Sequence, residues 1–280
     1  MKNKIKYLII ILLIVAILLI FYINKQKKDN STYGTEFKNY KEEYVAPKTK
    51  YECNEFSIIN MSTHELLQIY FNNYKNAVLE EPEKAYNLLE KEYREKRFGS
   101  IEAYKLYIEN NKEKITISAI DSYQVKQDGD NNRYICIDTE GNYYIFNETA
   151  VMDYTVILDT YTIDLPEFTE KYNTATEQQK VALNIDKFMQ AINDKNYRYA
   201  YSCLADSYKN NNFKTLEEFE IYAKQNFYLS SRVGYKQFDI LQEVYTYSVI
   251  LTNEETGEQM NKTFIVQLGE GTEFVLSFNI

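Results

Sequence analysis

The sequence lacks tryptophan and has little of several residue types that mark specialised protein classes. Only 3 prolines and 8 glycines occur in 280 residues, which excludes collagen-like, mucin-like and linker-dominated chains. Apolar residues make up 45% of the chain and charged residues 26%, which is ordinary for globular proteins and argues against disorder. The length accommodates two domains of about 100 residues each. The richness in Lys, Asn, Ile and Tyr favours a bacterial source.

Cysteine and histidine are also scarce. Cys53, Cys136 and Cys203 are odd in number and show no CxxC spacing, so we expect incidental thiols rather than a disulfide framework. His64 is the only histidine, and its place at the start of a capped helix predicts that it faces solvent. The acidic pair in residues 128–130 fits a hairpin tip better than a cation loop. We therefore expect no metal, no cofactor and no histidine-based triad.

Positive charge is concentrated at the amino terminus. Residues 1–28 contain six lysines and no acids, which leaves 26 basic and 41 acidic residues in the remainder, a net charge of −15. Such a balance disfavours nucleic acid or anionic lipid as the main partner, because neither finds a cationic surface.

The amino terminus also carries the longest apolar run. Residues 7–23 (YLIIILLIVAILLIFYI) contain no charge, Gly or Pro and are flanked by lysines on both sides. This pattern predicts a single membrane span within residues 1–28, of about 25 Å at the helical rise per residue. A cleaved signal peptide is the main alternative, but no small-residue cleavage site comes after the run. The short amino-terminal tail favours a cell-membrane protein whose carboxy-terminal domains are extracytoplasmic.

Two later stretches of the chain repeat each other. Residues 29–61 are polar and read as a tether, and the segments beginning at Tyr74 and Phe188 then align with an offset that settles at 115 residues. Eight apolar or aromatic positions match: Ala85, Tyr86, Leu89, Tyr93, Phe98, Ile101, Tyr104 and Tyr107 pair with Ala200, Tyr201, Leu204, Tyr208, Phe213, Leu216, Phe219 and Tyr222.

The helices that precede these stretches agree as well. Leu67, Phe71, Tyr74 and Val78 match Val181, Ile185, Phe188 and Ile192, with the spacing of one helical face. Capping boxes begin at Ser62, Thr176 and Thr215, and Pro82 suits a first helical turn. We predict helices near 63–80, 82–96 and 100–111, and near 177–193, 197–210 and 215–227.

After the third helix of each copy, the spacing of apolar residues changes from the helical period to that of strands. Runs of β-branched and aromatic residues, such as RYICID and NYYIFN or VYTYSVIL and KTFIVQL, alternate with glycine-containing turns at 139–142, 255–258 and 269–272. The strands predict an antiparallel sheet in each copy. The fold class is therefore α+β, with domains at 62–163 and 176–280 joined by a polar linker at 164–175.

The matched elements resemble one known family. The repeated AYNLL and AYSCL cores, the third helices beginning FGSIEAYKLY and FKTLEEFEIY, and the final TFIVQLGEGTEFVLSF resemble the nuclear transport factor 2-like superfamily. The resemblance implies a cone in which helices close one face of a curved sheet, around a pocket that some members use and others fill. The first copy lacks the glycine-rich turn of the second, which leaves the pairing of its last strand open.

The strands carry the candidate site residues. Enzymes of this family place a carboxylate and a tyrosine inside the cone, and Asp121, Asp138, Asp153 or Asp239 could point inward. Strand alternation does not identify the concave face. A set of strand tyrosines could line a concave sheet or a docking surface, with core filling as the alternative. They are Tyr143, Tyr144, Tyr154, Tyr161, Tyr245 and Tyr247.

These observations leave three functions open. The first is a membrane-anchored, non-catalytic scaffold or assembly protein of a bacterial cell envelope, binding an envelope protein or another copy of itself through tandem domains. Its plan is similar to that of assembly components of Gram-positive conjugative-transfer machines. The second is a small-ligand binding module using the cone pocket, and the third is a pocket enzyme. A cone filled by Tyr, Phe and Leu would favour the first, whereas an empty apolar pocket with an inward carboxylate would favour the second or third.

Overall fold

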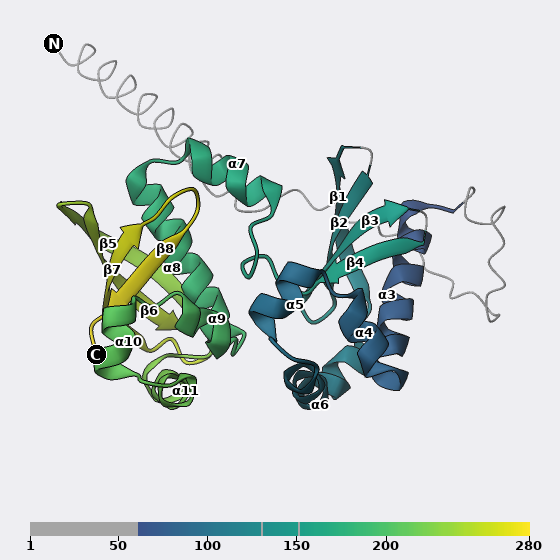
Figure 1. The fold of residues 1–280 in the computed structure, drawn as a ribbon, viewed down its shortest axis with the longest axis horizontal. Coiled ribbons are helices and arrows are strands. Elements are labelled where there is room, and N and C mark those ends of the chain that lie inside the picture. The colour runs from purple at the N-terminus through teal and green to yellow at the C-terminus, as the bar shows by residue number, and fades with distance from the viewer. Residues whose placement is uncertain (1–60, 130, 151) are drawn as a thin grey trace, which may run out of the picture.

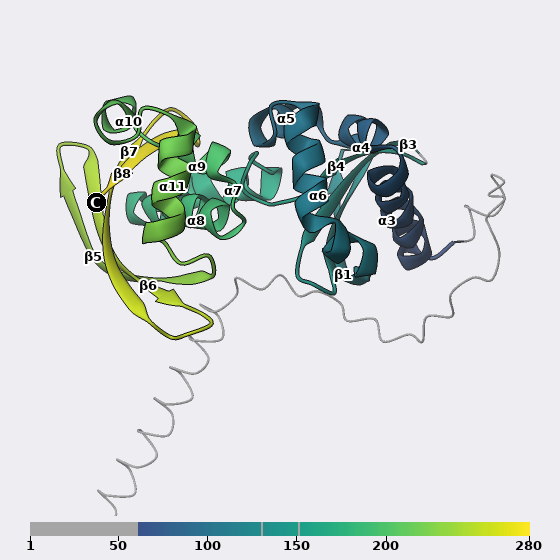
Figure 2. The same cartoon turned by 90° about the horizontal axis from the view of Figure 1, so that it is seen from below.

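The computed structural model describes residues 61–129, 131–150 and 152–280. They form two α+β units side by side, each with helices followed by a four-stranded antiparallel sheet (Figures 1 and 2). The predicted span at 7–23, Cys53 and all but the last residue of the predicted tether at 29–61 lie outside the described residues. None of the helices described is both long and apolar enough to cross a membrane.

The first unit begins with α3 (Thr63–Glu80), α4 (Pro82–Leu88), α5 (Lys91–Arg97) and α6 (Ile101–Ile117). Its sheet comes next in the order β1 (Ile120–Asp128), β2 (Asn131–Asp138), β3 (Tyr143–Ala150) and β4 (Asp153–Ile157). The pairing that the sequence left open is therefore antiparallel, with β4 along β3.

The second unit repeats this order after α7 (Pro166–Thr174), which occupies most of the predicted linker. Its helices are α8 (Glu177–Asn193), α9 (Tyr197–Ser202), α10 (Asp206–Asn212) and α11 (Leu216–Asn226). Its sheet contains β5 (Ser231–Leu241), β6 (Val244–Asn253), β7 (Gln259–Leu268) and β8 (Phe274–Phe278). The predicted glycine turns lie where expected, and Gly141, Gly257 and Gly271 have positive φ.

Helix starts reflect the local capping chemistry. Ser62 and Thr176 form complete capping boxes with Glu65 and Gln179, as predicted. Thr215 forms half of one, because its side chain accepts from the backbone of Glu218 while that carboxylate accepts from the backbone N–H of Lys214.

The prediction of one continuous middle helix in each unit is wrong, because the structure has two shorter helices there. The breaks fall at Leu89 and Leu204, which form isolated parallel bridges with Val156 and Leu276 on the last strands. The amide after each leucine donates to the carbonyl of Val156 or Leu276, at 3.0 and 2.9 Å. The break recurs at the 115-residue offset, so both units use the same tertiary contact to end α4 and α9.

The third helix of the first unit is longer than predicted. The β-branched run beginning at Ile115 reads as a strand, but α6 continues to Ile117. Ile115 is buried in the first core, so packing of this turn overrides its β propensity.

Aromatic rings form the core of both units in matching arrangements. In the first, Tyr86 and Phe98 lie 5.4 and 5.0 Å from Tyr104, between ring centroids. In the second, Tyr201 and Phe213 lie 5.7 and 5.5 Å from Phe219. A cation covers Tyr86 and Tyr201 from the same side-chain position, Arg94 in one unit and Lys209 in the other. The repeat that the sequence predicts is therefore also a repeat of contacts.

A buried ion pair of the first unit lies beside the place where α5 packs against α9 of the second unit. Arg97 is 8% exposed and Asp159, which comes after β4, is 4% exposed; Arg97 Nη1 lies 3.2 Å from Asp159 Oδ2. Tyr93 and Thr162 also donate to Asp159, at 3.0 and 2.9 Å. Such a pair is costly to break, because either partner alone would be a buried unpaired charge.

A glycine contact completes the junction. Gly99 lies just after α5 with φ of 72°, and a Cβ there would lie 2.6 Å from the Arg198 guanidinium of α9. A side chain at this position would meet both a strained backbone and the neighbouring unit.

Candidate functional site

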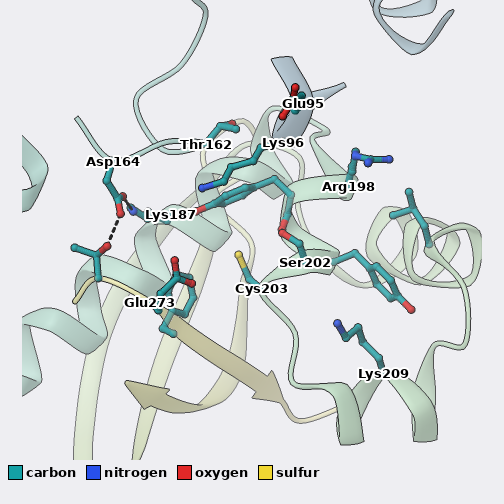
Figure 3. A pocket seen from close by; sticks show the side chains of 15 residues that line it. Glu95, Lys96, Thr162, Asp164, Lys187, Arg198, Ser202, Cys203, Lys209 and Glu273 are labelled. Carbon is teal, nitrogen blue, oxygen red and sulfur yellow. Dashed lines mark hydrogen bonds and ion pairs between the residues drawn. The ribbon is translucent and has the colours of Figure 1, made fainter. Parts of the chain in front are cut away.

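A cleft of about 680 Å³ lies at the junction of the two units (Figure 3). One wall comes from α5, with Glu95 and Lys96. The rest comes from the segment after β4, from α8 to α11, from the β7–β8 turn and from the start of β8. The cleft depends on both units being held together, because neither contributes all of its walls.

A charged contact fixes one end of the cleft. Asp164 accepts from Lys187 Nζ of α8 and, at 2.5 Å, from Thr272 Oγ1 of the β7–β8 turn, as the dashed lines of Figure 3 mark. Lys187 is buried and its Nζ lies 3.7 Å from the centroid of the Phe168 ring. Burial lowers the pKa of Lys187, and the Asp164 carboxylate opposes that shift. This group holds the inter-unit segment against the second unit.

Three other cations surround the cleft. Lys96 pairs with Glu92 and Lys209 pairs with Asp206, each across one helical turn with at least one exposed partner. Arg198 is exposed and packs on Gly99. Exposed pairs of this kind contribute little stability, so a ligand can recruit these cations at small cost.

The cysteine in the cleft is not set up as a nucleophile. Burial raises the pKa of Cys203 to about 12, which keeps its thiol protonated near neutral pH. Burial also raises the pKa of the adjacent Tyr199 hydroxyl. The arrangement therefore offers binding groups from two units rather than an activated thiol.

Five of the six predicted contact tyrosines are buried in the protein interior, so the contact interpretation does not hold for them. Tyr154 donates to the Tyr70 carbonyl and Tyr161 accepts from Arg97, at 3.0 and 2.7 Å. The other three, Tyr144, Tyr245 and Tyr247, have exposures of 5–6%. Alternation brought the four that lie on strands to the covered faces, and all five fill the interior. Tyr143 alone is half-buried, and it lines two cavities.

The predicted carboxylates do not converge inside a cone. Asp121, Asp153 and Asp239 are exposed. Asp138 is buried, but its carboxylate accepts from the backbone N–H groups of Glu140 and Asn142 and so stabilises the β2–β3 turn. The predicted exposure of His64 is only partly right, because its half-buried ring lies 6.2 Å from that of Tyr123.

Sequence reasoning missed the charged residues that matter at the junction. Arg97 reads as an ordinary solvated residue at a helix end, and Asp159, Asp164 and Lys187 have no spacing that links them. One weak signal was available, because Lys187 directly precedes Phe188, which the helical spacing assigns to the buried face of α8. Only the packing of the two units brings these groups together.

Cys136 and Cys203 are free buried thiols, in agreement with the absence of a disulfide framework between them. Within residues 61–129, 131–150 and 152–280, no group of three or more His, Cys, Asp or Glu side chains is placed to hold one metal ion. Comparison of the chain with protein-family models, curated proteins and solved structures finds no match. The resemblance to the nuclear transport factor 2-like superfamily therefore remains a prediction from the sequence.

Proposed function

We propose that this chain is a membrane-anchored, non-catalytic scaffold of a bacterial cell envelope that binds protein through two nuclear transport factor 2-like units. Residues 7–23 would supply the anchor, and the units would lie outside the cytoplasm. A protein partner or a second copy of the chain would occupy the cleft between the units.

The observation that carries this proposal is the aromatic filling between helices and sheet in both units. In the first, Tyr70 stacks on Tyr154 with centroids 4.2 Å apart, and Phe71 meets Tyr144 edge-on at 4.8 Å. In the second, Phe188 lies within 5.8 Å of both Phe264 and Phe278. These rings fill the space between helices and sheet, where the resemblance would imply a pocket, and this filling favours binding at the outer surface.

The cleft supports the same proposal through its construction. Its walls come from both units, and α5, which supplies one wall, packs against α9 of the other unit. A preformed surface lowers the ordering cost that association must overcome. Lys96, Arg198 and Lys209 would pair with acidic groups of the partner.

Photo-crosslinking in native membranes tests the proposal. A benzophenone amino acid at position 198, inside the cleft, should capture a protein that mass spectrometry identifies. The same probe at the exposed Glu113 of α6 serves as the matched control and should not capture it. Recovery of no protein at position 198, with a small molecule retained through purification, would favour the ligand-binding alternative.

Topology is tested separately. Protease added to intact protoplasts should degrade residues 29–280 if these lie outside the cytoplasm. Protection in intact cells, with digestion only after lysis, would contradict the anchored, outward-facing arrangement.

A further inference from the structure

A second cavity, of about 340 Å³, lies on another side of the junction and has a different character. One wall is α6, where Tyr107, Asn111 and Lys114 are spaced by four and three residues and so lie on one helical face. The end of α8 and Lys195 form the opposite side, and Arg97 also lines the cavity.

The hydrogen bonding of Arg97 is incomplete on one edge. Its contacts to the Tyr161 hydroxyl and to Asp159 are both made by Nη1, at 2.7 and 3.2 Å. Nε is buried and has no hydrogen-bond partner within the described part of the chain. The Nε–Nη2 edge is the one that pairs bidentately with a carboxylate or phosphate. A buried charged donor without a partner is unfavourable, so its retention calls for an explanation.

Two further cations line the same cavity. Lys114 is exposed on α6, and Lys195 lies after α8 with φ of 56°. Glycine is favoured at such a left-handed position after a helix, because a Cβ is unfavourable there. A lysine at this position places a cation at the cavity although the backbone there is strained.

The negative charges of the cavity do not cancel these cations. Asp159 is already engaged by Arg97, Tyr93 and Thr162, and Asp194 is the other carboxylate in the lining. Among the residues that the structure describes, Arg97, Lys114 and Lys195 stand against two carboxylates, so the lining has a positive excess. Asn111 keeps its side-chain oxygen as an acceptor, because its amide nitrogen donates to the Tyr107 carbonyl at 2.8 Å.

We propose that this cavity binds a small polar molecule through a carboxylate or phosphate group, which pairs with the Nε–Nη2 edge of Arg97. Lys114 and Lys195 attract the anion, and Asn111 accepts from a hydroxyl of the ligand. This activity is additional to protein binding in the cleft. Because the lining comes from both units, the bound molecule also strengthens their junction.

Isothermal titration calorimetry of the full chain in detergent micelles tests the site. Inorganic phosphate and succinate are titrated separately at about 10 mM, where weak ligands still bind, against sodium chloride of matched ionic strength. Saturable binding of one probe with one site per chain is expected, and the probe that binds identifies the oxyanion. No saturable heat from either probe would overturn the proposal.

Variants locate the binding. Lys114→Gln and Lys195→Gln should each raise the Kd about threefold to fivefold, and they change exposed residues that the fold does not need. Arg97→Lys should raise it at least about tenfold, because lysine keeps the charge but loses the paired edge. Lys112→Gln, on α6 but outside this cavity, is the matched control.

Arg97→Lys could disturb the junction, which altered near-ultraviolet circular dichroism would reveal. In that case the Kd values of Lys114→Gln and Lys195→Gln alone test the proposal. An unchanged Kd in both, or an equal change in Lys112→Gln, would overturn the proposal. Neither result depends on whether the cleft captures a protein.

Discussion

The outer faces of the two sheets differ although the sheets are built alike. Val156 and Leu276 both bridge a helix break, so their strand partners Phe146 and Val266 correspond, and so do the neighbours Ile145 and Ile265. Ile145 is fully buried, whereas Ile265 is 42% exposed. The same position is therefore core in one unit and surface in the other.

The segment between the units accounts for this difference in exposure, because it covers the outer face of the first sheet. Leu165 shares the first unit's core cluster with Ile145, and Glu167 of α7 pairs with Arg133 on β2 at 3.3 Å. The second sheet has no equivalent cover within the described residues. Its flanking outer positions are Thr246 and Ser277, where the first sheet has Ile135 and Ile157. A duplicated unit thus acquires a different surface according to the segment attached to its carboxy-terminal end.

The largest effect should come from breaking the buried Arg97–Asp159 ion pair, which belongs to the first unit alone. Asp159→Ala leaves Arg97 buried without its partner and should cost about 3–5 kcal/mol. The position that matches Arg97 in the second unit is Asn212, which is exposed; Asn212→Ala should cost less than about 0.5 kcal/mol. Hydrogen-exchange mass spectrometry in urea reads each unit separately. Similar losses from the two substitutions would contradict the special role of this ion pair.

The covered and uncovered faces predict a second contrast. Ile145→Ala should destabilise the first unit by about 3 kcal/mol, because it opens a cavity in a packed interior. Ile265→Ala should cost the second unit less than about 1 kcal/mol. The same exchange measurement compares the two. A large cost at Ile265 in the isolated protein would mean that another segment covers the second sheet.

A pH dependence should distinguish the units. Burial raises the pKa of Asp186 on α8 to about 6, against the opposing Tyr235 hydroxyl and Lys171, from an ordinary value of 3.8. The resulting stabilisation is complete below pH 3.8 and is lost as the pH rises through about 6, a change of about 3 kcal/mol. The matching residue of the first unit is Asn72, which does not titrate. Asp186→Asn should flatten the pH profile of the second unit only, and an unchanged profile would exclude Asp186 as its source.

The smallest effect concerns two matched aromatic pairs. Tyr74 and Tyr104 share a buried hydrogen bond of 2.7 Å between their hydroxyls, whereas the second unit has Phe188 and Phe219 at these places. Tyr74→Phe should cost about 1–2 kcal/mol, because the remaining hydroxyl loses its partner. Adding Tyr104→Phe should recover part of this loss and reproduce the second unit's pair. Strictly additive costs would show that the hydroxyls act independently.

The sequence predicted those features that local chemistry or helical periodicity encodes. The starts of α3 and α8 come from capping side chains, and the buried face of α8 comes from Val181, Ile185, Phe188 and Ile192. The breaks after α4 and α9 could not be foreseen, because a strand more than sixty residues away causes them. The assignment of the strand residues Tyr144, Tyr154, Tyr245 and Tyr247 to a contact surface was wrong for a different reason, because alternation separates two faces without saying which is covered. The cavity at Arg97 depends on how the units meet, and no local pattern encodes that.

The bridge between each helix break and the last strand also bears on how the chain folds. The bridges Leu89–Val156 and Leu204–Leu276 join residues that are distant in sequence. Each unit is therefore complete only when such a long-range contact has formed. Helices and hairpins can form earlier from nearby residues, whereas contacts of this separation are slow to form. Pairing of the last strand therefore completes each unit. Until this strand pairs, the edge of β3 or β7 is exposed and can pair with a strand of another chain.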